Sequence, residues 1–269
     1  MTSENSTDSA WTGMVAVADT ALAAADSGGL GHPVVYLNGQ FATKSYWRRV
    51  IAELGSGYRH ITYDERARGR KSRRSADYSF EATVRDVDAV LKARGVDRPI
   101  VVGWSYGAAV AVHWAVRNPD RVAGVVLVDG AYPFDWSDDA PPERIRRLFR
   151  RMAWLMPLLR PTGLTPRMTA EQMANSNIEL NEIYGALGPV LDQVAFPLRY
   201  VVASGGNFGG GRDEMERMRA SLDPVLTRNP HIKVSARVTS NHAKVLRKDS
   251  RAVADAVREL AATPDRPGR

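Results

Sequence analysis

One serine of the chain lies in a pattern that suits a nucleophile. The segment Gly103-Trp-Ser-Tyr-Gly107 directly follows the apolar run 99–102 and directly precedes the helix-forming run 108–116. In a sharp turn from strand to helix, side chains two positions before and after the serine would collide, so both positions favour glycine. Such a turn holds the hydroxyl of Ser105 at a helix N-terminus, which favours developing negative charge. The pattern predicts that Ser105 attacks a carbonyl carbon.

The segments around this turn alternate between short apolar runs and runs of helical periodicity. A hairpin is predicted over residues 14–25, upstream of the alternation. Strands are predicted over 33–37, 59–63, 99–102 and 122–128, and helices over 44–54, 80–94 and 108–116. The alternation predicts an α/β fold with a mostly parallel, doubly wound sheet and helices on both faces.

The alternation stops at Ala131 and resumes near residue 196. Residues 132–195 hold no convincing strand, and their tryptophan, methionine and leucine side chains are separated by several prolines. A strand over 198–203, a helix over 213–228, a strand over 232–238 and a helix over 250–262 follow. We therefore expect a core of residues 13–131 and 196–262, a helical lid at 132–195, and disorder at 1–12 and 263–269.

Several segments together resemble the α/β-hydrolase fold superfamily over about residues 13–262. The Ser105 turn resembles its nucleophile elbow, and Asn38-Gly39 resembles its oxyanion turn. Residues 64–72 resemble its Asp-x-Arg-Gly-x-Gly-x-Ser loop, although here the loop is longer and one glycine is replaced. Residues 118–129 resemble the segment after the elbow, and Asn241-His242 resembles the histidine loop. The resemblance implies an α/β-hydrolase fold with a serine nucleophile and a helical lid.

A serine hydroxyl needs an adjacent base, and the resemblance points to one histidine. The superfamily places its histidine last in the chain, after the final strand. Of the five histidines, only His242 lies in a loop after the last predicted strand. We expect His242 to be the base.

The acid that would orient this histidine has three candidates. The superfamily usually supplies it after the strand 198–203, but Asn207 stands near the expected position there. Asp129 ends the strand that follows the elbow helix, a place from which some members draw the acid, and we expect it to be the acid. Asp213, or an Asn207 that orients the ring without a charge, remains as an alternative.

The resemblance also implies the donors of an oxyanion hole. They are the backbone N–H groups of Gln40 and Tyr106, where Gly39 allows close approach of the chain.

Composition excludes several kinds of site and partner. The chain has no cysteine, so disulfides, thiolate zinc sites and cysteine nucleophiles are excluded. The net charge is +7, with basic clusters at 66–74 and 144–151 that lack the interleaved aromatics of a single-strand-binding surface. We expect no nucleic-acid partner, no metal and no cofactor.

The N-terminal region indicates a soluble protein. It lacks the basic start of a secretory signal, and the apolar run 14–25 is broken by Asp19 and too short to span a bilayer. We expect a cytoplasmic protein with no membrane partner, and the oligomeric state stays open.

These observations predict a serine hydrolase that cleaves a carboxylic ester of a small, largely apolar molecule through an acyl-enzyme. Serine at the elbow argues against the epoxide hydrolases and dehalogenases of the superfamily, which use aspartate there. A thioesterase, lactonase, carbon–carbon bond hydrolase, cofactor-free haloperoxidase, acyltransferase or non-catalytic binder remains as an alternative.

Overall fold

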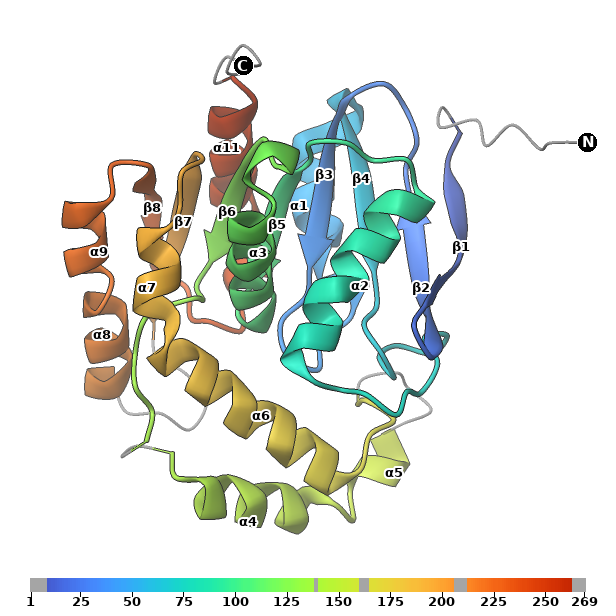
Figure 1. Cartoon of the computed structure of the whole chain (residues 1–269), viewed down its shortest axis with the longest axis vertical. Coiled ribbons are helices and arrows are strands. Elements are labelled where there is room, and N and C mark those ends of the chain that lie inside the picture. The colour runs from blue at the N-terminus through green and yellow to red at the C-terminus, as the bar shows by residue number, and fades with distance from the viewer. Residues whose placement is uncertain (1–8, 138–139, 160–164, 206–211, 263–269) are drawn as a thin grey trace, which may run out of the picture.

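The computed structural model describes residues 9–137, 140–159, 165–205 and 212–262. Over these residues, eight strands form one sheet in the order β1-β2-β4-β3-β5-β6-β7-β8 (Figure 1). The pairs β1–β2 and β2–β4 are antiparallel, and all the other neighbours are parallel. The strands are β1 (Trp11–Val17), β2 (Thr20–Asp26), β3 (His32–Leu37), β4 (Tyr58–Tyr63), β5 (Ile100–Trp104), β6 (Gly124–Val128), β7 (Leu198–Ala203) and β8 (Ile232–Val238).

Helices cover both faces of this sheet, as the alternating pattern predicts. Helices α2 (Phe80–Ala93) and α3 (Tyr106–Arg117) lie in front of the sheet in Figure 1, and α1 (Arg48–Leu54) and α11 (Ser250–Ala261) lie behind it. Each face has its own apolar core, built on alternate residues of the same strands. Every residue of β5 and β6 is buried, which is why both strands consist mainly of valine and other apolar residues. The predicted fold class is confirmed.

The N-terminal hairpin begins earlier than expected. Trp11 and Thr12 were expected to be disordered, but they pair with Asp26 and Ala25 at the start of β1. The guanidinium of Arg94 lies 4.1 Å from the centroid of the Trp11 ring, and this cation–π contact holds the end of the strand. Residues 1–8 and 263–269 lie outside the described residues.

Between β6 and β7 the chain forms helices, which we call the helical insertion (residues 132–195). They are α4 (Pro142–Met152), α5 (Met156–Leu159), α6 (Ala170–Gly185) and α7 (Leu187–Asp192). Figure 1 shows α6 crossing the end of the sheet, with α4 packed on its outer side. Thr169 and Gln172 form a capping box that starts α6. No strand occurs in the described part of the insertion, in line with its sequence.

The helix predicted over 213–228 is interrupted. The structure has α8 (Arg212–Ala220) and α9 (Asp223–Arg228) in its place. Pro224 lies in the first turn of α9, and because proline has no backbone N–H it cannot continue the hydrogen-bond ladder of the preceding helix. A short helix, α10 (Val245–Lys248), precedes α11. Over the described residues, every helix is too short or too polar to cross a bilayer.

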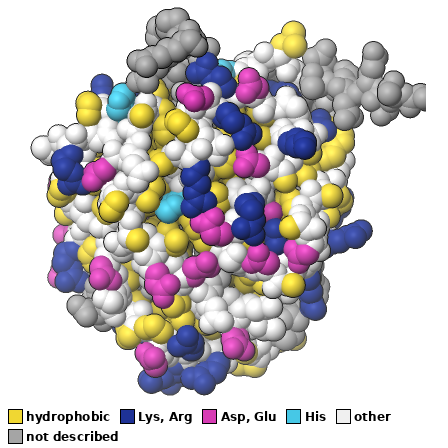
Figure 2. Space-filling view, in the orientation of Figure 1, with side chains coloured by type: hydrophobic (Ala, Val, Ile, Leu, Met, Phe, Trp, Pro, Cys, Tyr) yellow, Lys and Arg dark blue, Asp and Glu magenta, His cyan; other side chains and the backbone are white. Residues whose placement is uncertain are grey.

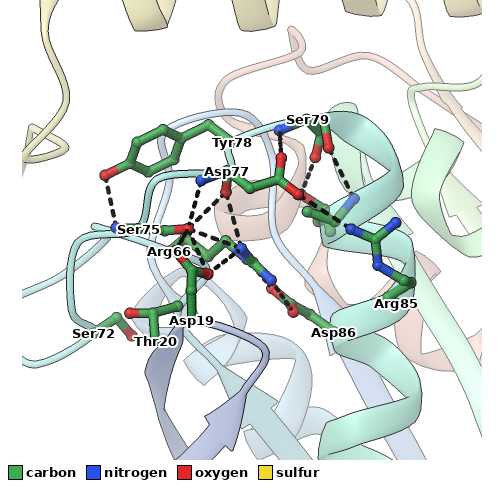
Figure 3. A network of polar contacts seen from close by, with 12 residues as sticks. Asp19, Thr20, Arg66, Ser72, Ser75, Asp77, Tyr78, Ser79, Arg85 and Asp86 are labelled. Atoms are coloured by element: carbon green, nitrogen blue, oxygen red, sulfur yellow. Dashed lines mark hydrogen bonds and ion pairs between the residues drawn. The ribbon is translucent and has the colours of Figure 1, made fainter.

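The loop after β4 is fixed by a buried arginine (Figure 3). Arg66 donates to both carboxylate oxygens of Asp86 on α2 at 2.8 Å, and its third nitrogen donates to Asp19, Ser75 and the carbonyl of Asp77. The arginine and Asp86 side chains are both 3% exposed. This network ties the first hairpin, the loop and α2 together beside the oxyanion turn.

Candidate active site

The serine turn has the geometry that its glycines imply. Ser105 lies between β5 and α3 with φ 55° and ψ −118°, a strained conformation for a residue with a side chain. A Cβ on Gly103 would collide with the carbonyl of Gly107, and a Cβ on Gly107 would collide with the carbonyl of Leu37 on the neighbouring strand. Both positions therefore require glycine, and the turn presents the hydroxyl at the carboxyl edge of the sheet.

Three side chains predicted from the sequence meet in a row. His242 Nε2 lies 3.0 Å from Ser105 Oγ, and His242 Nδ1 lies 2.9 Å from Asp129 Oδ2. The nucleophile candidate follows β5, the carboxylate follows the adjacent strand β6, and the histidine follows β8. Because both hydrogen bonds use the same ring, a serine proton can pass to Nε2 while the carboxylate holds the N–H at Nδ1.

The carboxylate of Asp129 is buried and held by several donors. It is 1% exposed and accepts from the hydroxyl of Tyr132 at 2.9 Å and from the backbone N–H of Ala203 at 3.2 Å. Arg219 on α8 approaches both carboxylate oxygens at 3.4 Å. Burial opposes ionisation, but the hydrogen bond and charge of His242 and the charge of Arg219 outweigh it. The pKa of Asp129 is therefore lowered, and the group is a carboxylate at neutral pH.

The ring of His242 packs against an aromatic side chain. The ring of Trp104 lies 5.5 Å from that of His242, tilted by 34°. The loop that carries His242 turns at Asn241, whose carbonyl and side chain accept from the backbone N–H groups of Lys244 and Val245. The side chain of His242 is 20% exposed, so one edge of the site is open to solvent.

The oxyanion turn lies beside the serine. A Cβ on Gly39 would approach the Trp104 ring to 2.7 Å, so glycine lets the turn lie against the strand that carries the nucleophile. The side chain of Gln40 bonds to Ser176 and Asn177 on α6, which connects the turn to the helical insertion. The other predicted donor belongs to Tyr106, the first residue of α3, where a backbone N–H has no acceptor within the helix.

A buried glutamate, Glu65, forms hydrogen bonds with the oxyanion turn. Glu65 accepts from the backbone N–H of Asn38 at 3.2 Å and from its side-chain amide at 3.0 Å. The side-chain oxygen Oδ1 of Asn38 accepts in turn from the indole N–H of Trp47. Burial raises the pKa of Glu65 to about 7 although both Asn38 hydrogen bonds favour the carboxylate. A cavity of about 10 Å³, room for about one water, adjoins Glu65, Gly39 and Gln40.

Of the two alternative candidates, the structure describes only Asp213, which has no hydrogen bond to His242. Asp213 is exposed in the first turn of α8, and Nδ1 of His242 is occupied by Asp129. Asn207 lies outside the described residues. Among the described residues, no three histidine, aspartate or glutamate side chains gather in a way that would hold a metal ion.

Sequence reasoning missed the groups that surround the acid and the insertion's contact with the elbow. Arg219 and Tyr132 carry no motif, and the hydroxyl of Tyr184 on α6 donates to the backbone carbonyl of Ser105 at 3.2 Å. Tyr132 lies three residues after Asp129, a spacing that permits a local bond. For Arg219, 90 residues from Asp129 in the chain, no such signal exists.

About half of the chain is similar in sequence to known hydrolases. Residues 32–157 match the model of a family described as alpha/beta hydrolase fold. A haloalkane dehalogenase of Mesorhizobium japonicum is 28% identical over 139 residues, which cover 51% of this chain and 45% of the dehalogenase. The chain thus matches less than half of the length of that relative.

Solved structures match nearly the whole chain. An esterase from Exiguobacterium antarcticum has a TM-score of 0.70 at 18% identity and covers 93% of this chain and 98% of its own. A haloalkane dehalogenase variant from Bradyrhizobium elkanii has a TM-score of 0.72 at 18% identity and covers 94% of this chain and 98% of its own. At such identities the likeness shows the fold. The chain is thus similar to α/β hydrolases over residues 32–157 and has the same fold as these solved structures.

Proposed function

We propose that the protein is a serine hydrolase that cleaves a carboxylic ester, or a related acyl compound, of a small molecule through an acyl-enzyme on Ser105. The observation that carries this proposal is the row Ser105–His242–Asp129, with hydrogen bonds of 3.0 and 2.9 Å. Removal of a carboxylate from such a row typically costs about 10⁴ in kcat.

The proposed reaction has two halves. His242 Nε2 takes the hydroxyl proton while Ser105 Oγ bonds to the carbonyl carbon, and the same ring then returns the proton to the departing alcohol as the carbon–oxygen bond breaks. Water, deprotonated by the same nitrogen, next attacks the acyl-enzyme and frees the acid and the serine. Asp129 stabilises the imidazolium in both halves. The N–H groups of Gln40 and Tyr106 are the proposed donors to the oxyanion, and each such donor contributes about 3 kcal/mol.

The nature of the nucleophile separates ester cleavage from dehalogenation. Attack by a serine oxygen on a carbon–halogen bond would leave an alkyl ether, and water does not cleave an ether in a site of this kind. Attack on an ester leaves a second ester, which water does cleave. Position 105 is serine, so the chemistry of the row favours acyl compounds over alkyl halides.

The apolar side chains of the helical insertion do not by themselves indicate an apolar substrate. Its buried methionines, Met156, Met168 and Met173, pack with Ile145 and Phe149 in one cluster, so they stabilise the insertion itself. The cavity beside the oxyanion turn is small and is lined partly by polar groups such as Arg68 and Ser176. These observations lend no weight to an apolar acyl group.

Covalent labelling and ester hydrolysis test the proposal together. A fluorophosphonate probe should label the protein, and Ser105→Ala should abolish the labelling. The protein should hydrolyse p-nitrophenyl acetate. Asp129→Asn should lower kcat by about 10⁴, whereas the exposed Asp213→Asn should leave it within twofold. Labelling that persists in Ser105→Ala, or a loss of activity in Asp213→Asn equal to that in Asp129→Asn, would refute the assignment.

A further inference from the structure

Large apolar side chains lie exposed on one short segment of the helical insertion. Among the described residues, eight large hydrophobic side chains are exposed, and five of them fall within residues 148–158. The exposed fractions reach 73% for Trp154, 67% for Leu158 and 54% for Leu148; Met152 and Leu155 complete the set. A solitary exposed leucine needs no explanation, but a cluster of this kind marks an interaction surface.

The exposure follows from how α4 packs. Only Ile145 and Phe149 of this helix are buried, and they form a single stripe one turn apart. They pack into the cluster with Met173 and Ala174 of α6, and the ring of Phe149 meets that of Phe41 edge to face at 5.9 Å. Packing against α6 accounts for this stripe and leaves the side chains at 148, 152, 154, 155 and 158 without a described partner in the core.

The same segment carries a concentration of positive charge. Residues 142–158 contain five arginines and one acidic residue, Glu143. The side chains of Arg146, Arg147, Arg150 and Arg151 are exposed, and among the described residues none of these four forms an ion pair. In Figure 2, Lys and Arg side chains gather at the lower edge of the molecule, where Figure 1 shows α4. We call residues 144–158 the basic apolar face.

We propose that the basic apolar face docks on an anionic lipid surface, with α4 lying in the plane of the membrane interface. Arginines beside exposed leucine and tryptophan are the composition of helices that bind such interfaces, since the cations meet lipid phosphates while the apolar groups enter the acyl boundary. A second copy of the chain would bring the same positive face against this one, and nucleic acid would leave the leucines in water. The expectation of no membrane partner rested on the lack of a spanning segment, a different mode of attachment.

Docking there would bring the membrane close to the site. Helix α4 packs on α6, and α6 contacts both Gln40 and the backbone of Ser105. The face and the serine are thus joined through one helix, so a docked protein would present its serine near the lipid surface. This surface is independent of the proposed ester hydrolysis, because its residues take no part in the row around His242.

Vesicle binding tests the inference on the full chain. The protein should sediment with phosphatidylcholine vesicles that contain phosphatidylglycerol and remain in solution with phosphatidylcholine alone, and binding should fall as salt rises. The triple variant R147Q/R150Q/R151Q should lower the partition coefficient about a hundredfold, since each basic residue near an anionic surface contributes a factor of about five. Trp154→Ser combined with Leu158→Ser should lower it at least tenfold.

A matched variant controls for net charge. R70Q/K71Q/R74Q removes the same charge from exposed positions of the other basic cluster and should keep binding within about threefold. Circular dichroism and fluorophosphonate labelling establish that each variant is folded. No binding to anionic vesicles at low salt, or equal losses in both triple variants, would overturn the proposal. A dimer in sedimentation that is lost in the Trp154/Leu158 variant would instead assign the face to a second copy.

Discussion

Two arginine-rich segments, residues 66–74 and 144–151, look alike in the sequence, but the first buries two of its arginines, Arg66 and Arg68, and the second buries none. In the first, Arg66 is 3% exposed on its side chain and saturated with carboxylate and carbonyl acceptors (Figure 3). In the second, all five arginines are exposed, and Arg146, Arg147, Arg150 and Arg151 form no ion pair among the described residues.

Arg66 is buried because acidic residues far away in the sequence pair with it in the fold. Asp86 lies twenty residues after Arg66, on the helix that packs beside the loop, and Asp19 lies at the tip of the first hairpin. Among the described residues, no carboxylate of a neighbouring element pairs with Arg146, Arg147, Arg150 or Arg151 of α4. A run of arginines thus has no fixed role of its own, and the elements packed around it decide whether the charge is structural or free to meet a partner.

The largest effect on stability should follow from breaking the buried pair. Arg66→Met leaves the carboxylate of Asp86 buried without its bidentate partner, and such losses typically cost about 3–5 kcal/mol. Arg150→Met on α4 should change the free energy of unfolding by less than about 0.5 kcal/mol. Urea titrations of both variants measure the contrast. Equal effects would mean that the two segments are energetically alike.

A smaller effect, dependent on pH, is expected from Glu65, which belongs to the first segment's loop. Its pKa in the folded protein is raised to about 7, so between about pH 4.5 and 7 the folded chain keeps a proton that the unfolded chain has lost. The contribution of Glu65 to the free energy of unfolding is therefore highest at low pH. It falls by about 3 kcal/mol as the pH rises through that window.

Urea unfolding between pH 5 and pH 8 measures this decline. Glu65→Gln should remove the fall in the free energy of unfolding with pH, even if the substitution also changes stability by the same amount at every pH. The exposed Glu143→Gln should leave the pH dependence unchanged. A slope that survives Glu65→Gln would assign the pH dependence to another group.

The smallest effect should appear where an arginine has a partner but no burial. Arg85 and Asp77 form an ion pair of 3.1 Å in which the side chains are 61% and 43% exposed. Arg85→Gln should cost less than 1 kcal/mol, and added salt should shrink the difference further because solvent screens such pairs. If Arg85→Gln lowered the free energy of unfolding as much as Arg66→Met does, an acidic partner without burial would be enough to make an arginine stabilising.

Local sequence patterns predicted the order and type of most helices and strands. They did not predict contacts between residues far apart in the sequence. The buried strands β5 and β6 and the turn at Ser105 are visible because burial on both faces and a steric demand for glycine act within a few residues. The interruption at Pro224 and the start of β1 at Trp11 depend on one proline and one cation–π contact, which periodicity does not register.

The carboxylate partner of His242 illustrates the limit for the site. Sequence reasoning favoured Asp129 but kept Asp213 and Asn207 open, because the reach of a side chain from one strand end to another depends on strand order and twist. The exposure of α4 was equally hidden, since the apolar residues of 148–158 have a composition that suits a core as well as a surface.

The position of Asp129 on β6 has a consequence for how this protein can change. The proposed nucleophile and acid stand on adjacent central strands, while the segment 204–211 after β7 contains no acidic residue at all. That segment therefore need not supply a carboxylate, although Gly205 must stay glycine because a Cβ there would lie 2.8 Å from the backbone nitrogen of Asn241. Directed evolution could therefore change the sequence of 206–211 while Asp129 after β6 stays unchanged.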